Sequence, residues 1–517
     1  MANQTLFATL RGALLPKTNT VNSHNAPAYE LEPKQALAQY AATGCFGRTF
    51  YATANEQLTR VLELCDAVEP EFVARLAIYS RTQSFMKDMP ALLCAWLSKR
   101  DQRLHEAVFA KVIDNTRMLR TYVQILRSGV VCRKSLGTAP KRLVREWLQS
   151  RDEDSLFAAS VGQSPSLSDI VKMVHPKPAS AQREAFYGYM LGRPHEAQNL
   201  PFLIRTFEAF KAGESVEVPD LPFMMLSSLP LSKKDWSEVA RKATWQTTRM
   251  NLNTFARHGV FETPGLTRLI AERLRNSEEV KRSRVFPYQL LSAYTNVEST
   301  VPEVVKEALE FAMEQAIANV PHIKGSVVVC PDVSGSMRSP VTGHRAGSTT
   351  SVRCVDVAGL MAATILRKKS NARVIPFEQD VVEVKVDGSD SVMKNAEQLA
   401  SVGGGGTNCS APMRLLNKEK AKADLVIYVS DNESWVDAGR GRGTGLMAEW
   451  SQFRQRNPQA RLVCLDIQPN QTTQACERAD ILNIGGFSDQ VFEVISAFAS
   501  GHLEADHWIA RINAVAA

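Results

Sequence analysis

The sequence lacks the features that define several large classes of protein. No apolar run approaches the roughly 18 residues that a membrane helix needs, so a membrane protein is not expected. The nine cysteines are scattered, odd in number and without a CxxC pair, which argues against a disulfide framework and against thiolate metal sites. The first residues contain Arg11 within a short apolar stretch and show no clear cleavage site, so no signal peptide is expected. We therefore expect a cytoplasmic protein whose cysteines act as small apolar residues.

Motifs of the common hydrolases are also missing. Gly403–Thr407 is rich in glycine, but no Gly-Lys-Ser/Thr follows it, so it does not match a phosphate-cradling loop. No nucleophile elbow of a serine hydrolase and no zinc-binding constellation occurs. These absences favour a binding protein over an enzyme.

The composition indicates a soluble globular chain with an uneven charge. Its 517 residues are 44% hydrophobic and 22% charged, which is ordinary for about two to four domains. Residues 1–322 contain 40 Lys and Arg against 33 Asp and Glu, whereas the remainder contains 21 of each. The whole net charge of +7 therefore lies in the first part. A polyanionic partner would bind there; the alternative is a mildly basic, solvated surface.

The pattern of apolar residues predicts three regions. Residues 1–35, rich in Asn, Thr and Pro, are expected to form an extended arm. Residues 36–321 show helical spacing almost throughout, which favours stacked, HEAT-like helix pairs, with an irregular helical domain as the alternative. In residues 322–517 strand-like runs, 381–386 among them, alternate with helices. That alternation predicts an α/β domain with a mostly parallel sheet.

Three polar loops follow apolar runs in this last region. Asp332, Ser334 and Ser336 come directly after the run 327–330, and Thr407 follows four glycines. Asp431 ends a second apolar run, and ligands in open α/β sheets lie beyond the carboxyl ends of strands. Two carboxylates and three hydroxyls suit a hard cation such as Mg²⁺, although an Asp–Ser turn bonded to its own backbone is the simpler alternative. The set resembles the metal-ion-dependent adhesion site of von Willebrand A domains.

The densest cationic stretch lies in the helical region. A helix is expected from Thr138, which could cap it, through an apolar face that includes Trp147. Five cations accompany a single Glu in this stretch, and phosphates would relieve their mutual repulsion. We therefore take as candidate RNA contacts Arg133, Lys134, Lys141, Arg142 and Arg145. The alternative is a solvated basic face.

Weaker clusters continue the pattern. Lys172 lies near His175, whose position before Pro176 predicts a helix end at Val174. Arg249 follows Trp245, and Arg284 precedes Phe286 and Tyr288; rings beside cations suit unpaired bases. Lys172, His175, Arg249 and Arg284 complete the candidate RNA contacts.

Motifs from both regions together make the resemblance specific. The chain is similar to the Ro ribonucleoprotein autoantigen family, in which a TROVE module precedes a von Willebrand A domain, and to its bacterial members in particular. The motifs that carry the resemblance are Gly44–Gly47 with Phe50-Tyr51, Pro140–Trp147, His175–Pro178, Val285–Tyr288, Asp332–Met337, Gly405–Ser410 and Ser430–Ser434.

This resemblance implies a monomeric ring of HEAT-like repeats, closed by the von Willebrand A domain. It implies small structured noncoding RNAs, called Y RNAs, on the outer basic surface, and single-stranded 3′ ends of misfolded RNAs in a central hole. It also implies a role in RNA quality control alongside an exoribonuclease, with neither DNA nor a membrane as partner. The loops 338–350 and 439–443 depart from the pattern.

Two other functions compete with this interpretation. The metal loops could form a protein-adhesion module in which a partner's carboxylate completes the coordination. Alternatively, Asp332, Asp424, Asp431 and Glu433 could hold a metal that activates water for hydrolysis. One metal held mostly by hydroxyls, however, has no evident general base beside it.

Overall fold

The structure is a computed structural model. It describes residues 15–43, 46–162, 164–215, 217–283, 285, 287–318, 320–341, 352–438, 443–486, 489–501 and 507–516. Contacts divide the chain into a helical unit, Glu69–Val285 with Ala293–Ala312 and Val515–Ala517, and an α/β unit that contains Met1–Val68, Phe286–Ser292 and Met313–Ala514. In the described residues no helix is both long and apolar enough to cross a membrane.

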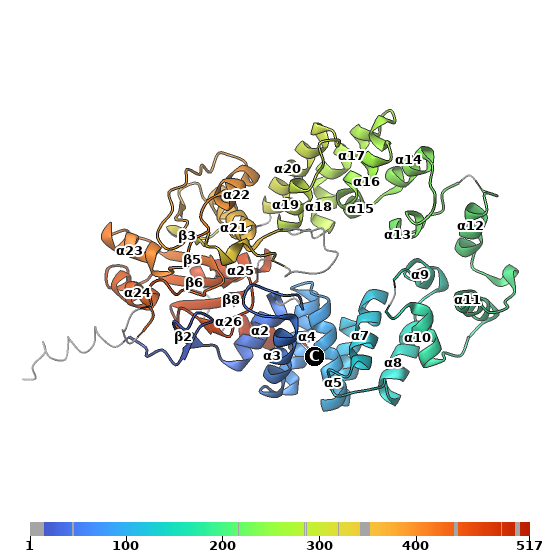
Figure 1. Cartoon of the computed structure of the whole chain (residues 1–517), viewed down its shortest axis with the longest axis horizontal. Helices are drawn as coiled ribbons and strands as arrows, with labels where there is room; N and C mark the ends of the chain where they lie inside the picture. Colours follow the sequence, from blue (N-terminus) through green and yellow to red (C-terminus); the bar gives the residue numbers. More distant parts are fainter. Residues whose placement is uncertain are drawn as a thin grey trace, which may run out of the picture. The chain divides into compact units, whose positions relative to one another are not determined.

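The helical unit is built from short helices that follow one another along the chain (Figure 1). Its helices are α4 (Pro70–Thr82), α5 (Asp88–Arg100), α6 (Gln102–Val112), α7 (Thr116–Ser128), α8 (Thr138–Gln149), α9 (Glu153–Ala158), α10 (Leu167–Val174), α11 (Ala181–Leu191), α12 (Phe202–Lys211), α13 (Phe223–Leu226), α14 (Lys233–Lys242), α15 (Trp245–Met250), α16 (Leu252–Arg257), α17 (Leu266–Arg275) and α18 (Ser277–Ser283). The residues of α19 (Pro287–Thr295) and α20 (Glu303–Ala318) are divided between the two units.

These helices pack mostly on near neighbours in sequence. Helix α5 contacts α4, α6 and α7, and α10 contacts α7, α8 and α11. The local signals are regular: Asn115 caps α7 by accepting from Met118 N, and Gly129 ends it in a left-handed conformation. Helix α8 begins where expected, but its N-cap is Gly137, so the predicted capping role of Thr138 was wrong. Helix α10 ends at Val174, as the following His-Pro pair predicted.

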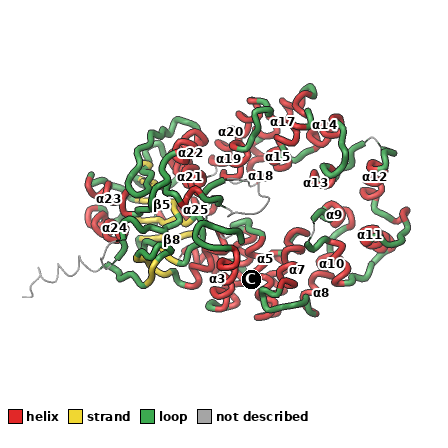
Figure 2. Tube along the Cα trace, viewed as in Figure 1, coloured by secondary structure: helices red, strands yellow, loops and turns green. Residues whose placement is uncertain are grey.

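The α/β unit holds every strand of the described chain, as the yellow segments of Figure 2 show. Its elements are β1 (Thr20–Val21), β2 (Pro27–Glu30), α2 (Pro33–Thr43), α3 (Ala54–Asp66), β3 (Val327–Pro331), α21 (Cys354–Lys368), β4 (Arg373–Val374), α22 (Val392–Ser401), α23 (Ser410–Lys418), β5 (Leu425–Ser430), α24 (Gly445–Arg456), β6 (Arg461–Asp466), β7 (Thr472–Thr473), β8 (Ile481–Gly485), α25 (Asp489–Ala499) and α26 (His507–Asn513).

Five strands form a parallel sheet in the order β4-β3-β5-β6-β8. Alternate residues of β3, β5 and β6 pack into one core with helices α23 and α24, for example Tyr428 and Trp450. Helix α21 packs on β3, β4 and β5, on the side of the sheet opposite α23 and α24 (Figure 1). The predicted fold class, a helical domain followed by an α/β domain with a mostly parallel sheet, is confirmed. Closure of the helical part into a ring remains a prediction.

The order of the strands places a switch point between β3 and β5. The chain leaves β3 for β4 on one side of it and later returns to β5 on its other side. Parallel sheets bind ligands at the carboxyl ends of the strands that flank such a point. The residues that follow β3 and β5 are Asp332 and Asp431.

Two segments differ from expectation. Residues 381–386, predicted to resemble a strand, contain only an isolated bridge from Val381 to Phe377. Residues 20–30 of the expected arm form the hairpin β1–β2, and β2 pairs with β7.

Contacts also group α2 and α3 with the α/β unit, whereas the sequence suggested boundaries after residues 35 and 321. Arg284, most of the loops 338–350 and 439–443, and Gly44-Cys45 lie outside the described residues.

Candidate metal centre and RNA-binding surface

The five predicted metal ligands lie together at the carboxyl edge of the sheet. Asp332 and Ser334 are fully buried, and Ser336, Thr407 and Asp431 are exposed by 7% or less. Ser334 N donates to Asp332 Oδ1 over 2.8 Å, and the hydroxyl oxygens of Ser334 and Ser336 are 3.3 Å apart. Backbone hydrogen bonds join the loops: Gly335 N donates to Gly405 O over 2.9 Å. The five side chains that the sequence singled out as candidate ligands therefore lie close together.

The glycines before Thr407 allow the two loops to approach closely. Gly403 has a φ of +78°, and a Cβ there would lie 2.3 Å from Val333 O. A side chain at this position would therefore push the loops apart. Thr407 is held from the other side, because its carbonyl accepts from both Trp435 N and Val436 N over 3.1 Å.

Ionisation of both Asp332 and Asp431 is unfavourable, because the two carboxylates are buried close to each other. Burial, followed by the charge of Asp431, raises the pKa of Asp332 to about 7. Burial likewise raises the pKa of Asp431 above its ordinary range. Ser430 Oγ donates to Asp332 Oδ2 over 2.5 Å, which partly offsets this cost. A cation between the two groups would remove their mutual repulsion.

The residues fit a hydrated divalent cation. Mg²⁺ takes one or two carboxylates, adds other oxygen ligands and retains several waters. Two carboxylates and three hydroxyls converge here, and the buried Tyr51 hydroxyl lacks a well-formed hydrogen bond among the described residues. Burial and the nearby Asp431 raise the pKa of Tyr51 well above its usual range, so its hydroxyl stays protonated. It could donate to a water of the cation, and so it suits the same occupant.

The N-terminal hairpin adds residues that sequence reasoning missed. Asn22 Nδ2 donates to Ser434 O over 2.6 Å, and Ser23 N donates to Glu433 Oε2 over 2.8 Å. The His24 ring lies 5.5 Å from that of Trp435. The hairpin therefore fixes the loop that follows Asp431. Because about 410 residues separate these partners, no local sequence pattern signals the contact.

A third carboxylate at this edge was also missed. Asp466 ends β6, is fully buried, and accepts a hydrogen bond from Asn432 Nδ2. Burial raises its pKa well above the ordinary range. The signal was available, since Asp466 ends an apolar strand just as Asp431 follows one. Asp424, in contrast, precedes β5 and accepts from Ser326 N, so it lies at the opposite edge and cannot join a metal site with Asp332. That part of the hydrolase alternative was wrong.

In the helical unit, three arginines of the basic stretch already have partners. Arg133 Nε donates to Ser98 Oγ over 2.8 Å, which ties the loop before α8 to α5. Arg142 pairs with Glu146 on its own helix and with Glu106 of α6, a carboxylate that the sequence pattern did not place there. Arg145 Nε donates to Val174 O at the end of α10.

That last bond brings the second cluster beside the first. Lys172 and His175 lie at the end of α10 and are exposed, as is Lys134, while Lys141 on α8 is half-buried. His175 adopts a left-handed conformation, with a φ of 49°, and caps the helix. None of these four side chains forms a hydrogen bond or ion pair with a described residue. These three lysines and this imidazole ring could therefore contact a ligand without breaking a bond to a described residue.

The third cluster does not form the predicted stacking surface. Trp245 is 2% exposed, and its indole Nε1 donates to Leu274 O over 3.1 Å. Arg249 is 9% exposed, with Nε 3.4 Å from Gln246 Oε1. The prediction that Trp245 offers a face to a base was therefore wrong.

Comparisons with known proteins give two domain matches, which overlap at residues 326–377 and together span residues 226–499. The model of the TROVE domain matches residues 226–377, and that of the Ro60 vWA domain matches residues 326–499. The RNA-binding protein RO60 of Deinococcus radiodurans is 25% identical over 530 residues, covering 93% of this chain and 95% of the relative. The protein of the same name from Caenorhabditis elegans is 24% identical over 245 residues, 45% of this chain and 37% of the relative.

A solved structure shows the same fold. The crystal structure of the Deinococcus radiodurans RO (RSR) protein matches with a TM-score of 0.62 at 21% identity, covering 91% of this chain and all of that one. The parallel sheet with its carboxyl-edge loops is thus a von Willebrand A domain, and it is combined with a TROVE domain. The chain belongs to the Ro family.

Proposed function

We propose that the protein is an RNA-binding scaffold without catalytic activity of its own. It would hold a small, structured Y-like RNA on the surface formed by α8 and α10, and take single-stranded 3′ ends of misfolded RNA as further ligands. The observation that carries this is a group of three lysines and a ring on and beside α8 and α10 that form no hydrogen bond or ion pair with a described residue: Lys134, Lys141, Lys172 and His175. A relative that matches 93% of the chain is named an RNA-binding protein.

In this proposal the protein works in the cytoplasm, in noncoding-RNA quality control or decay. Cleavage would belong to a separate exoribonuclease; Glu433, whose pKa burial and the charge of Asp431 raise to about 7, is the carboxylate that a hydrolase would use as its base.

The proposal includes one Mg²⁺ in the von Willebrand A domain. Asp332, Ser334, Ser336, Thr407 and Asp431 would hold it, directly or through water. The bound ion would supply positive charge at the edge of the sheet. The chain's own contribution is to bury and orient these oxygens through the bonds from Ser430 Oγ and Gly335 N.

A second candidate, protein adhesion at the metal edge, is favoured by exposed apolar side chains next to Thr407. Trp435 and Val436 are 43% and 39% exposed, and Phe50 is 55% exposed. The ring of Phe50 lies 4.9 Å from that of Tyr51, and Tyr51 and Trp435 flank His24. A partner carboxylate on the metal would be accompanied by contacts to this patch.

Crosslinking in the cell, followed by sequencing of the copurified RNA, tests the leading function. We expect one or a few discrete structured RNAs, and their loss when Lys141 and Lys172 are both replaced by Ala. A matched control is Lys234→Ala, which removes an exposed lysine of α14 that has no ion pair with a described residue. Recovery of no discrete RNA from the wild type would overturn the proposal and favour adhesion.

A further inference from the structure

Helix α7 carries a cationic face that the sequence analysis did not single out. Arg117, Arg120, Gln124 and Arg127 are spaced by three, four and three residues, so they share one side of the helix. The other side is buried, and the helix contains no Asp or Glu. Arg117 and Arg127 are exposed and form no hydrogen bond or ion pair with a described residue. Arg120 donates to Val161 O in the loop before α10.

Among the described residues, Asp169 near Arg127 balances only part of the positive charge around this face. Burial, and then the charge of Arg117, lowers the pKa of Arg120. Burial, Arg117 and Arg81 together lower the pKa of Lys87 in the same way. Like charges gathered on one surface favour an anionic ligand that would neutralise them.

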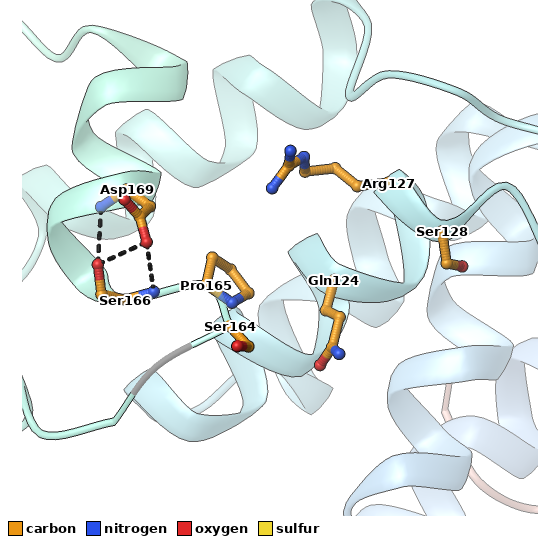
Figure 3. Close-up of a pocket in the computed structure, with 7 residues that line it drawn as sticks. All are labelled: Gln124, Arg127, Ser128, Ser164, Pro165, Ser166 and Asp169. Carbon is orange, nitrogen blue, oxygen red and sulfur yellow. Dashed lines mark hydrogen bonds between the residues drawn. The ribbon is translucent and has the colours of Figure 1, made fainter.

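A hollow opens beside the end of this face. It has a volume of about 720 Å³, within the range of small-ligand sites. Its walls are Gln124, Arg127 and Ser128 of α7 and Ser164, Pro165, Ser166 and Asp169 at the start of α10. Figure 3 shows the Arg127 side chain reaching from α7 into the open space over Pro165.

The one carboxylate in the hollow is already engaged. Asp169 Oδ2 accepts from Ser166 N over 3.0 Å and from Ser166 Oγ over 2.7 Å, which caps α10. These bonds, with smaller contributions from Lys172 and Arg127, lower the pKa of Asp169. Asp169 is thus close to both Arg127 and Lys172, and α10 links the wall of the hollow to the exposed Lys172.

We propose that the hollow receives one unpaired base of a bound RNA strand, while the flanking phosphates contact Arg117 and Arg120. The guanidinium plane of Arg127 and the ring of Pro165 offer stacking faces. The Gln124 amide offers both a donor and an acceptor to the base edge. This inference rests on the proposed RNA-binding function and adds a location on the helical unit, between α7 and α10, where one unpaired base would be held.

The chemistry favours a nucleotide over an acidic peptide. A carboxylate side chain would satisfy an arginine, but it would leave a hollow of this size largely unfilled and the Gln124 amide without a matching edge. A base in a duplex is stacked and paired, so it cannot enter. Binding at this site should therefore discriminate between single-stranded and duplex RNA.

The test measures fluorescence anisotropy with two labelled probes, an oligouridylate of about ten nucleotides and a blunt RNA duplex of about the same length. The variant is Gln124→Ala with Arg127→Lys, which keeps the charge but removes the guanidinium plane and the amide. We expect it to bind the single strand at least about fivefold more weakly and the duplex within about twofold of wild type. Arg268→Lys, at an exposed site on α17, is the matched control and should change neither affinity.

Three results would overturn the inference. If the variant binds the single strand as tightly as wild type, the hollow is not a base site, although the proposed function stands. If it loses affinity for both probes equally, Arg127 contacts phosphate only. If an acidic peptide of equal charge displaces the oligonucleotide as well as unlabelled oligouridylate does, the ligand is not a nucleotide. Wild-type protein that binds neither probe would remove this site, whereas the proposed function would fall only if no discrete RNA is also recovered by crosslinking.

Discussion

The charged side chains differ in burial between the carboxyl edge of the sheet, which carries the candidate metal ligands and is called the metal edge below, and the basic surface of α8 and α10 in the helical unit. At the metal edge, Asp332 and Asp431 are almost completely buried, and backbone bonds fix the loops that carry them. On the basic surface, Lys134, Lys172 and His175 are exposed, whereas Arg133, Arg142 and Arg145 are bonded to the protein itself.

The two sites therefore differ in how much free energy the repulsion between like charges costs in the absence of a ligand. Burial makes the two carboxylates costly in the absence of a cation, so binding and folding are coupled at the metal edge. Water and salt screen the exposed cations, so the basic surface costs little without a ligand and responds to ionic strength. A perturbation of the first site should therefore appear in stability, and one of the second in affinity.

The largest expected effect comes from Asp332→Asn, which removes one charge and little volume. At a Mg²⁺ concentration about 100 times its dissociation constant, the wild type should gain about 2.7 kcal/mol of stability from the metal. The variant should gain almost none, while its metal-free form should equal or exceed the metal-free wild type at about pH 8, because a buried charge is gone. Thermal unfolding with and without Mg²⁺ measures both.

Asp424→Asn is the control for this variant. It also removes an aspartate next to β5, but at the opposite edge of the sheet. It should leave the metal-dependent shift in melting temperature intact, whatever it does to the overall stability. Loss of the shift in both variants would contradict the assignment of the metal to the carboxyl edge.

The second effect is a pH dependence of the metal-free stability and, with the opposite sign, of the extra stability that Mg²⁺ adds. The pKa of Asp332 is raised from 3.8 to about 7 on folding, so its contribution to metal-free stability is present at low pH and is lost as the pH rises through about 7. Mg²⁺ needs the ionised form, so its stabilisation should weaken below pH 7 by about 1.4 kcal/mol per unit if one proton is displaced. Melting curves at about pH 5.5 to 8.5 measure this. A metal-dependent shift that is equal across the range would contradict it.

The position of the candidate metal ligands at one edge of the sheet could be predicted because the information for it is local. Asp332-Val333-Ser334 follows one apolar strand, and Asp431 follows a second. This pattern predicts that the candidate ligands are buried and that they lie at the ends of strands. Parallel strands then bring the two ends together without any further assumption. The alternation of helix and strand likewise predicted the fold of the α/β unit, except for residues 381–386, whose pattern was not enough to make a strand.

The basic surface could not be predicted in the same way, because pairing of a cation depends on distant residues. Arg142 meets Glu106, and Arg133 meets Ser98, about 36 and 35 positions away. Trp245 was expected beside solvent, but its ring completes the packing against α17 instead. The hairpin contact from Ser23 to Glu433 is non-local in the same sense. Charge density in a sequence therefore identifies candidates, and only the fold shows which of them are already satisfied.

The third prediction separates paired from unpaired cations. Replacing both Lys141 and Lys172 by Ala should reduce the magnitude of the slope of log affinity against log salt by about 1.4 to 1.8, if each contacts one phosphate. Arg142→Ala should change the slope by less than about 0.7, because Glu106 and Glu146 already neutralise much of its charge. A salt titration between about 50 and 200 mM measures both. Equal slopes for the double variant and wild type would remove these lysines from the surface.

The smallest expected effect is that of His175, and it tests whether anything other than charge contributes. Because its backbone is left-handed, Ala would add strain at the end of α10, and Asn is the better replacement since it adopts this conformation more readily. At about pH 8, where imidazoles are in general uncharged, loss of the ring should weaken RNA binding by about fivefold or less through lost stacking or hydrogen bonding. The salt slope should stay that of the wild type, in contrast to the lysine variant. A changed slope would make His175 part of the electrostatic surface, and an unchanged affinity would leave it only the role of capping α10.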